Sequence, residues 1–228
     1  MKKNLKGLFA LGGGLIAAFI VWTLLVSVID VRAVGPEGSS VGLASFNSAV
    51  ASAVGVHMAL YELTDLLSII PLGFIAGFGL LGLYQLVRRK SLMKVDCDIL
   101  VLGVFYVVVL AVFVLFEVVE INYRPVLIEG VLEASYPSST TMLSVCVLVT
   151  AMMQLRVRVG NRLISAVSVW FTGILAVVLV VGRIISGVHW ASDIIGGLLF
   201  SCGAVVLYYA AVCAVGEYLS NKRSVKAK

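Results

Sequence analysis

A histidine and an aspartate near residue 190 stand four positions apart in a chain that has only two histidines. His189 and Asp193 would share one face of a helix, because residues four apart lie one above the other. A carboxylate beside an imidazole fixes its tautomer and stabilises the charge that develops when the ring attacks an electrophile. Taken alone, the pair is equally compatible with an aspartate that faces solvent at a helix start. It is also compatible with a metal pair, although no third ligand is evident.

Two arginines accompany this pair. Arg183 precedes His189 by six residues, and Arg124 stands directly before a proline. A lone arginine in such a place can simply anchor the protein to lipid headgroups. Two of them, each beside a further polar cluster at the end of an apolar run, favour a clamp for an anion, because a guanidinium matches two phosphate oxygens at once.

A third cluster of small polar residues begins directly after Pro137 and leads into an apolar run. Hydroxyl residues at a helix N-terminus offer free backbone N–H groups and the positive end of the helix dipole. An ordinary helix cap is the alternative for this cluster alone. Together, the three clusters predict a phosphate site in which His189 and Asp193 are catalytic and the phosphate-binding residues are Arg124, Arg183, Ser138, Ser139 and Thr140.

The elements that must position these residues are long apolar helices. Hydrophobic residues make up 61% of the 228-residue chain and charged residues only 13%, a composition that places the chain in lipid. Six apolar runs have the length of transmembrane helices and lack the alternation of barrel strands. We therefore predict an all-α bundle of six transmembrane helices forming a single membrane domain, residues 1–228. The runs cover residues 7–29, 66–87, 99–116, 141–155 (extended back to Pro137), 163–182 and 194–216.

The basic residues predict the orientation of the bundle. Fourteen of the 17 lysines and arginines precede the first run, follow the last, or lie between runs two and three or four and five. The positive-inside rule then places both termini in the cytoplasm, and the phosphate site on the extracytoplasmic face of the cell membrane. Residues 31–65, on that outer face, predict a short outer helical segment. The net charge of +5 is thereby explained as a topology signal, and nucleic acid is not an expected partner.

At these residues the chain resembles the type 2 phosphatidic acid phosphatase superfamily of membrane lipid phosphatases. The family's third motif, Ser-Arg-x5-His-x3-Asp, is matched from Arg183 to Asp193, with Gly182 in place of the serine. The first motif, Lys-x6-Arg-Pro, is matched at Arg124 and Pro125, and Glu117 stands where the family has lysine. The second, Pro-Ser-Gly-His, reads Pro-Ser-Ser-Thr from Pro137 to Thr140. The resemblance covers roughly residues 60–215.

The resemblance implies that His189 is a nucleophile that forms a phosphohistidine, that Asp193 orients it, and that the arginines, Ser138 and the backbone at Ser139 hold phosphoryl oxygens. The departures matter, because the family's second-motif histidine protonates the leaving group and Thr140 cannot do so at neutral pH. Glu117 replaces a positive charge by a negative one. A phosphate leaving group needs less protonation than an alcohol, so a diphosphate substrate suits this site better than a monoester.

We therefore expect a membrane lipid-phosphate phosphatase that acts at the outer membrane surface without a metal or other cofactor. Its substrate would be a phosphorylated lipid, with polyprenyl diphosphates such as undecaprenyl diphosphate as the leading class. A catalytically silent relative that binds or transports a phosphorylated lipid is the alternative. That alternative gives the arginines the same role and explains Thr140 and Glu117 directly.

Overall fold

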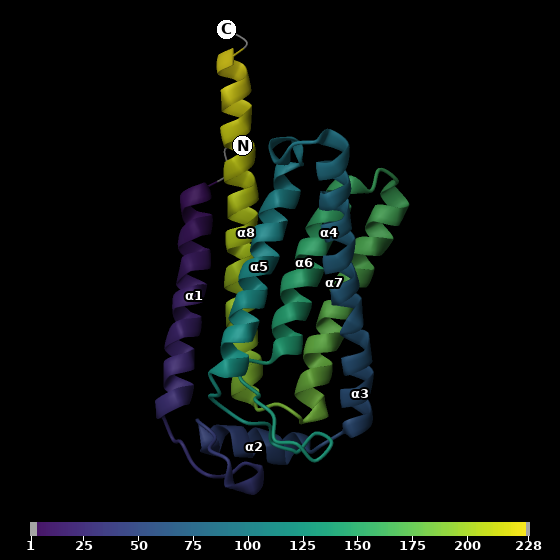
Figure 1. Ribbon diagram of the computed structural model, residues 1–228. Coiled ribbons are helices and arrows are strands. Elements are labelled where there is room, and N and C mark those ends of the chain that lie inside the picture. Colours follow the sequence, from purple (N-terminus) through teal and green to yellow (C-terminus); the bar gives the residue numbers. More distant parts are fainter. Residues whose placement is uncertain (1–3, 227–228) are drawn as a thin grey trace.

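The structure, a computed structural model, describes residues 4–226 and is built of helices (Figure 1). The predicted all-α fold is confirmed: within the described residues, six helices are long and apolar enough to cross a membrane. The α-helices in chain order are α1 (Leu5–Val28), α2 (Ala44–Val54), α3 (Met58–Leu67), α4 (Ile69–Arg89), α5 (Cys97–Val118), α6 (Ser139–Arg158), α7 (Arg162–Ser186) and α8 (Ala191–Lys226). Two short 3-10 turns, Pro36–Gly38 and Leu92–Lys94, lie in the loops.

The six spans correspond to the six apolar runs, with two differences in length. The second span begins earlier than predicted, because α3 continues into α4 and the two form one apolar stretch, Met58–Arg89. The last helix continues well past the predicted end at residue 216 and projects beyond the rest of the bundle (Figure 1). A charged helical tail needs no lipid around it, so hydropathy alone could not locate its end.

The two ends of the bundle differ in what covers them. At one end, α2 lies across the bundle beside the loop of residues 119–138 and the turn before α8 (Figure 1). We call this the site end, and its crossing helix confirms the predicted short helical segment between the first two spans. The opposite end holds the start of α1, the end of α8 and the basic loops after α4 and α6 (Figure 1). Lys2, Lys3 and Lys228, which contributed to the predicted charge asymmetry, lie outside the described residues.

The core is formed where α1 and α6 pack on α8. Gly203 in α8 allows close approach of α1, since a Cβ there would stand 2.9 Å from Cδ1 of Ile16. Near the site end, the indole of Trp22 donates a hydrogen bond to the carbonyl of Ser192 at 3.0 Å. The hydroxyls of Thr23 and Tyr136 lie 2.7 Å apart. The first helix is therefore attached to the segment that precedes α6 and to the first turn of α8.

A polar cluster ties the helices together at the end opposite the site. Arg158, at the end of α6, contacts Asp98 at 2.5 Å and Asp96 at 3.2 Å. Asp96 also pairs with Arg89 of α4 at 2.7 Å. This hydrogen bond from Arg89, together with the one from Arg158, holds the pKa of Asp96 below its usual range. The cluster fixes the register of α4, α5 and α6 relative to one another.

Candidate active site

The turn between α7 and α8 holds the predicted nucleophile at the site end of the bundle. Gly187 ends α7 in the left-handed conformation with φ of 68°, which favours glycine. A Cβ at this position would lie 1.9 Å from the carbonyl oxygen of Gly55. The backbone N–H of His57 also bonds the carbonyl of Ser186 at 2.9 Å. The turn that carries His189 is thus pressed against the link between α2 and α3.

His189 is buried and contacts a polar group through each ring nitrogen. Its Nε2 lies 3.3 Å from Nη1 of Arg124, and its Nδ1 lies 3.0 Å from Oγ of Ser135. A guanidinium only donates hydrogen bonds, so Nε2 must be the acceptor and the proton belongs on Nδ1. This assigns the tautomer whose free lone pair, on Nε2, faces the arginine.

Asp193 does not bond His189 directly, contrary to the expected pairing. The nearest carboxylate oxygen, Oδ2, lies 3.9 Å from Nδ1 of His189. Instead, the hydroxyl of Ser135 lies between them: it accepts from Nδ1 and donates to Oδ2 of Asp193 at 2.5 Å. The physical reason is that His189 precedes α8, which begins at Ala191, so the two residues do not share a helix face as predicted. The extended segment before Pro137 places the Ser135 hydroxyl between them.

The carboxylate of Asp193 is fully buried and accepts several further hydrogen bonds. Oδ2 accepts from the backbone N–H of Trp190 at 3.0 Å, and Oδ1 accepts from Nδ2 of Asn122 at 3.0 Å. The hydroxyl of Ser192 donates to Oδ1 at 3.2 Å. Such bonds offset the cost of burying a charge and hold the group in one orientation. Asp193 is therefore held in one position and supports the Ser135–His189 pair.

Burial sets the charge state of His189. It lowers the pKa of the imidazole to about 4, although the carboxylate of Asp193 acts in the opposite direction. The guanidinium of Arg124 lowers the pKa further. The ring is thus neutral at physiological pH, as a nucleophile must be.

The two predicted arginines lie near the same aromatic ring, that of Tyr61. The guanidinium carbon of Arg183 lies 4.6 Å from the centroid of the Tyr61 ring, and that of Arg124 lies 5.7 Å from it. Each also has a carboxylate partner: Arg183 Nη2 lies 2.7 Å from Asp65 Oδ1, and Arg124 Nε lies 2.9 Å from Glu133 Oε2. The latter is an ion pair without the angle of a hydrogen bond. Attraction to the ring face and to these carboxylates reduces the repulsion between two like charges.

Arg183 is 1% exposed, and its Nε and Nη1 have no hydrogen-bond partner within the described part of the chain. Unpaired buried donors are costly, because each has given up its bonds to water. A bound anion beside the guanidinium would supply the missing acceptors. This is the electrostatic property expected of an anion clamp.

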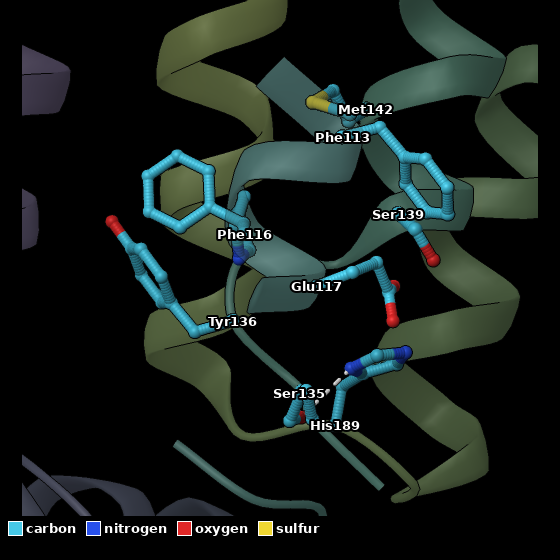
Figure 2. Close-up of a pocket in the computed structure, with 10 residues that line it drawn as sticks. Phe113, Phe116, Glu117, Ser135, Tyr136, Ser139, Met142 and His189 are labelled. Atoms are coloured by element: carbon cyan, nitrogen blue, oxygen red, sulfur yellow. Dashed lines mark hydrogen bonds between the residues drawn. The ribbon is translucent and has the colours of Figure 1, made fainter. Parts of the chain in front are cut away.

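The predicted phosphate-binding cluster at the start of α6 divides into two parts. Ser138 is buried and acts as the helix cap: its Oγ accepts from the N–H of Thr141 at 3.4 Å, and its own N–H donates to the carbonyl of Asp193 at 3.1 Å. The Ser138 hydroxyl is thus already engaged, as in an ordinary cap. Ser139 lines a pocket together with Ser135 and His189 (Figure 2), whereas Thr140 does not line it.

The same pocket contains Glu117, from the last turn of α5. Figure 2 shows its carboxyl group directed toward the ring of His189, with Ser139 nearby. The remaining wall is largely apolar and comes from Phe113, Phe116, Tyr136 and Met142. Within the described residues, no group of three or more His, Cys, Asp or Glu side chains could hold a metal ion.

Three residues that position the site were missed from the sequence. Ser135 carries no motif signal, and only the fold brings its hydroxyl to His189. Tyr61 lies on α3, more than fifty residues away from either arginine. Asn122 is held by the backbone N–H of Gly42, which donates to its Oδ1 at 2.9 Å. A polar residue directly after an apolar run was the only available signal for Asn122.

Comparison with known proteins agrees with the fold and with the sequence motifs. No curated protein is significantly similar to the chain in sequence. The fold is similar to the crystal structure of the first transmembrane PAP2 type phosphatidylglycerolphosphate phosphatase from Bacillus subtilis, with a TM-score of 0.55 and 20% sequence identity over 91% of this chain and 96% of that chain. Residues 115–216, which contain the histidine, both arginines and the α6 cluster, match the family model of the PAP2 superfamily. The part of the chain that carries these residues is thus similar to the PAP2 superfamily.

Proposed function

We propose that the protein is a membrane lipid-phosphate phosphohydrolase in which Nε2 of His189 attacks phosphorus. The observation that carries the proposal is the orientation of the imidazole. Nδ1 is committed to Ser135, and the lone pair of Nε2 points at Arg124, 3.3 Å away. A phosphoryl group held by that arginine would meet the nucleophilic nitrogen.

In this reaction the nitrogen forms a bond to phosphorus as the bond to the leaving oxygen breaks, giving a phosphohistidine that water then hydrolyses. The positive charge that develops on the imidazole is balanced by Asp193 through Ser135. Arg124, Arg183 and the backbone N–H of Ser139 at the start of α6 would hold the phosphoryl oxygens. Ser138 would keep that helix terminus in place. These groups supply the positive field, so the proposal includes no cofactor.

An apolar cavity of about 700 Å³ supports a lipid substrate. It lies among α4, α5 and α6 and is lined almost entirely by aliphatic and aromatic side chains and glycines. Phe113 lines both this cavity and the pocket of His189. A hydrocarbon chain lying in the cavity would therefore have its phosphorylated end next to the nucleophile. Because the family's proton donor is replaced by Thr140, we propose a polyprenyl diphosphate as the preferred class.

The decisive experiment measures phosphate release by the purified protein from a panel of lipid mono- and diphosphates. We expect turnover on diphosphates, its loss in His189→Ala, and acid-labile, base-stable phosphate on the wild-type protein after rapid quenching. Turnover retained in His189→Ala would exclude the phosphohistidine route. A wild type that is silent on every lipid yet binds one of them tightly would favour a lipid-binding relative instead.

We further propose that the whole chain is one membrane domain of the cell membrane with the site end outside. Single cysteines at Arg124 and Arg158, in a background without the four native cysteines, test this with an impermeant thiol reagent on intact cells. Labelling at position 124 and protection at position 158 are expected. The reverse pattern would place the site on the cytoplasmic face.

A further inference from the structure

The proposed reaction needs a proton donor that the motif residues do not supply. As the bond from phosphorus to the leaving oxygen breaks, that oxygen gains negative charge, and protonation helps it to leave even where it belongs to a phosphate. His189 cannot give this proton while it attacks. Thr140, at the position of the family's donor, does not line the pocket. A different side chain must therefore face the leaving oxygen.

Most carboxyl groups near the site are already engaged. Asp193 is fully buried and accepts hydrogen bonds from Ser135, Trp190 and Asn122. Glu133 pairs with Arg124, and Asp65 pairs with Arg183. Each of these groups is thus occupied by hydrogen-bond donors or by an arginine. None of them lines the pocket of His189.

Glu117 differs from these three carboxylates in its partners and in its position. Among the side chains that the structure describes, none forms a hydrogen bond or an ion pair with its carboxyl group. The residue is exposed, so it can exchange protons with water, yet its carboxyl group is directed into the pocket toward His189 (Figure 2). An attacking nitrogen and the leaving oxygen must lie on opposite sides of the phosphorus. A phosphoryl group between the two side chains would present its leaving oxygen to Glu117.

We propose that Glu117 is the general acid and base of the reaction, in place of the donor that Thr140 cannot provide. This inference rests on the proposed function. In the first step Nε2 bonds to phosphorus, the bond to the leaving oxygen breaks, and the proton of the Glu117 carboxyl group passes to that oxygen. In the second step the Glu117 carboxylate takes a proton from water, whose oxygen bonds to phosphorus as the P–N bond breaks. Glu117 ends protonated, and the cycle is balanced.

The test compares two amphiphilic phenyl phosphates with the same alkyl chain, one of which carries a nitro group on the ring. The nitrophenolate leaves without help, whereas the unsubstituted phenolate needs a proton. We expect Glu117→Gln to lower turnover of the plain substrate by about 100-fold or more, and that of the nitro substrate by less than about 10-fold, since a general acid typically contributes about 10²–10⁴-fold. Glu117 is exposed, so the substitution leaves the fold intact.

Glu120→Gln is the matched control. Glu120 is exposed, lies three residues further along, and accepts a hydrogen bond from the phenol of Tyr123 instead of lining the pocket. Glu120→Gln should leave the turnover of both phenyl phosphates unchanged. An equal loss on both substrates in Glu117→Gln, or no loss on either, would overturn the role of Glu117 while the proposed function stands. A wild type without turnover of either substrate would overturn both.

Discussion

The hydroxyl of Ser135 lies 3.0 Å from Nδ1 of His189 and occupies the place where a direct bond from Asp193 was expected. The imidazole is thus held by a neutral group that is itself polarised by a buried carboxylate. A hydroxyl can follow the ring as the ring becomes charged, because it both accepts and donates. This relationship makes Ser135 a testable positioning residue.

We predict that Ser135→Ala lowers kcat by about 10- to 150-fold, the equivalent of a charge-assisted hydrogen bond of about 1.5–3 kcal/mol. Ser135 and Asp193 act as one unit, so the double variant with Asp193→Asn should be hardly worse than Asp193→Asn alone. Ser201→Ala is the control, because it removes a buried hydroxyl that bonds the carbonyl of Gly197. Additive losses in the double variant would mean that Ser135 and Asp193 act separately.

His189 should titrate far below an ordinary histidine, because burial lowers its pKa from 6.5 to about 4. The chain has only two histidines, so in untagged His57→Gln protein the imidazole NMR signals report His189 alone. Between pH 6.5 and 4 the unfolded chain binds a proton that the folded protein does not. The free energy of unfolding should therefore fall as the pH falls through this window, and less so in His189→Gln. A midpoint near 6.5 would contradict the burial of this ring.

The two arginines should contribute comparably to anion binding. We expect Arg124→Ala and Arg183→Ala each to raise the Kd of a single-chain alkyl phosphonate by about 10- to 150-fold, since each removes charge-assisted hydrogen bonds of about 1.5–3 kcal/mol. Arg32→Ala provides the comparison, because that arginine is 62% exposed and pairs only with Asp30 among the described residues. If Arg124→Ala and Arg183→Ala changed the Kd no more than Arg32→Ala does, the two arginines would be only headgroup anchors.

Filling the apolar cavity should discriminate between long and short substrates. Gly79 and Gly103 line the cavity and have open space where a Cβ would stand. Replacing either with leucine should lower kcat/KM for a long-chain lipid phosphate at least about 10-fold and leave a short-chain analogue unaffected. Gly77→Leu is the matched control, because Gly77 also has open space but does not line the cavity. An equal loss of kcat/KM for both chain lengths would mean that the hydrocarbon chain of the substrate does not lie in this cavity.

Hydropathy was enough to predict the fold, because lipid imposes length and composition on each span. The convergence of Arg124, Arg183 and His189 at one end also followed, since topology alone places alternate loops together. The link through Ser135 could not be predicted, because it depends on the extended segment before Pro137. The role of Ser138 as a cap was the alternative that the sequence left open. The exclusion of Thr140 from the pocket depends on the rotation of α6 about its axis. Apolar patterning does not determine that angle.

Tyr61, whose ring lies beside both guanidiniums, and Asp65 come from α3, far outside residues 115–216 that match the family model. Variation in this one helix can therefore retune how strongly the site attracts an anion while every motif residue stays the same. A comparison of motif residues alone would not detect such a change in α3. Chimaeras that exchange residues 58–67 between relatives would change ligand preference and leave the motif residues unchanged.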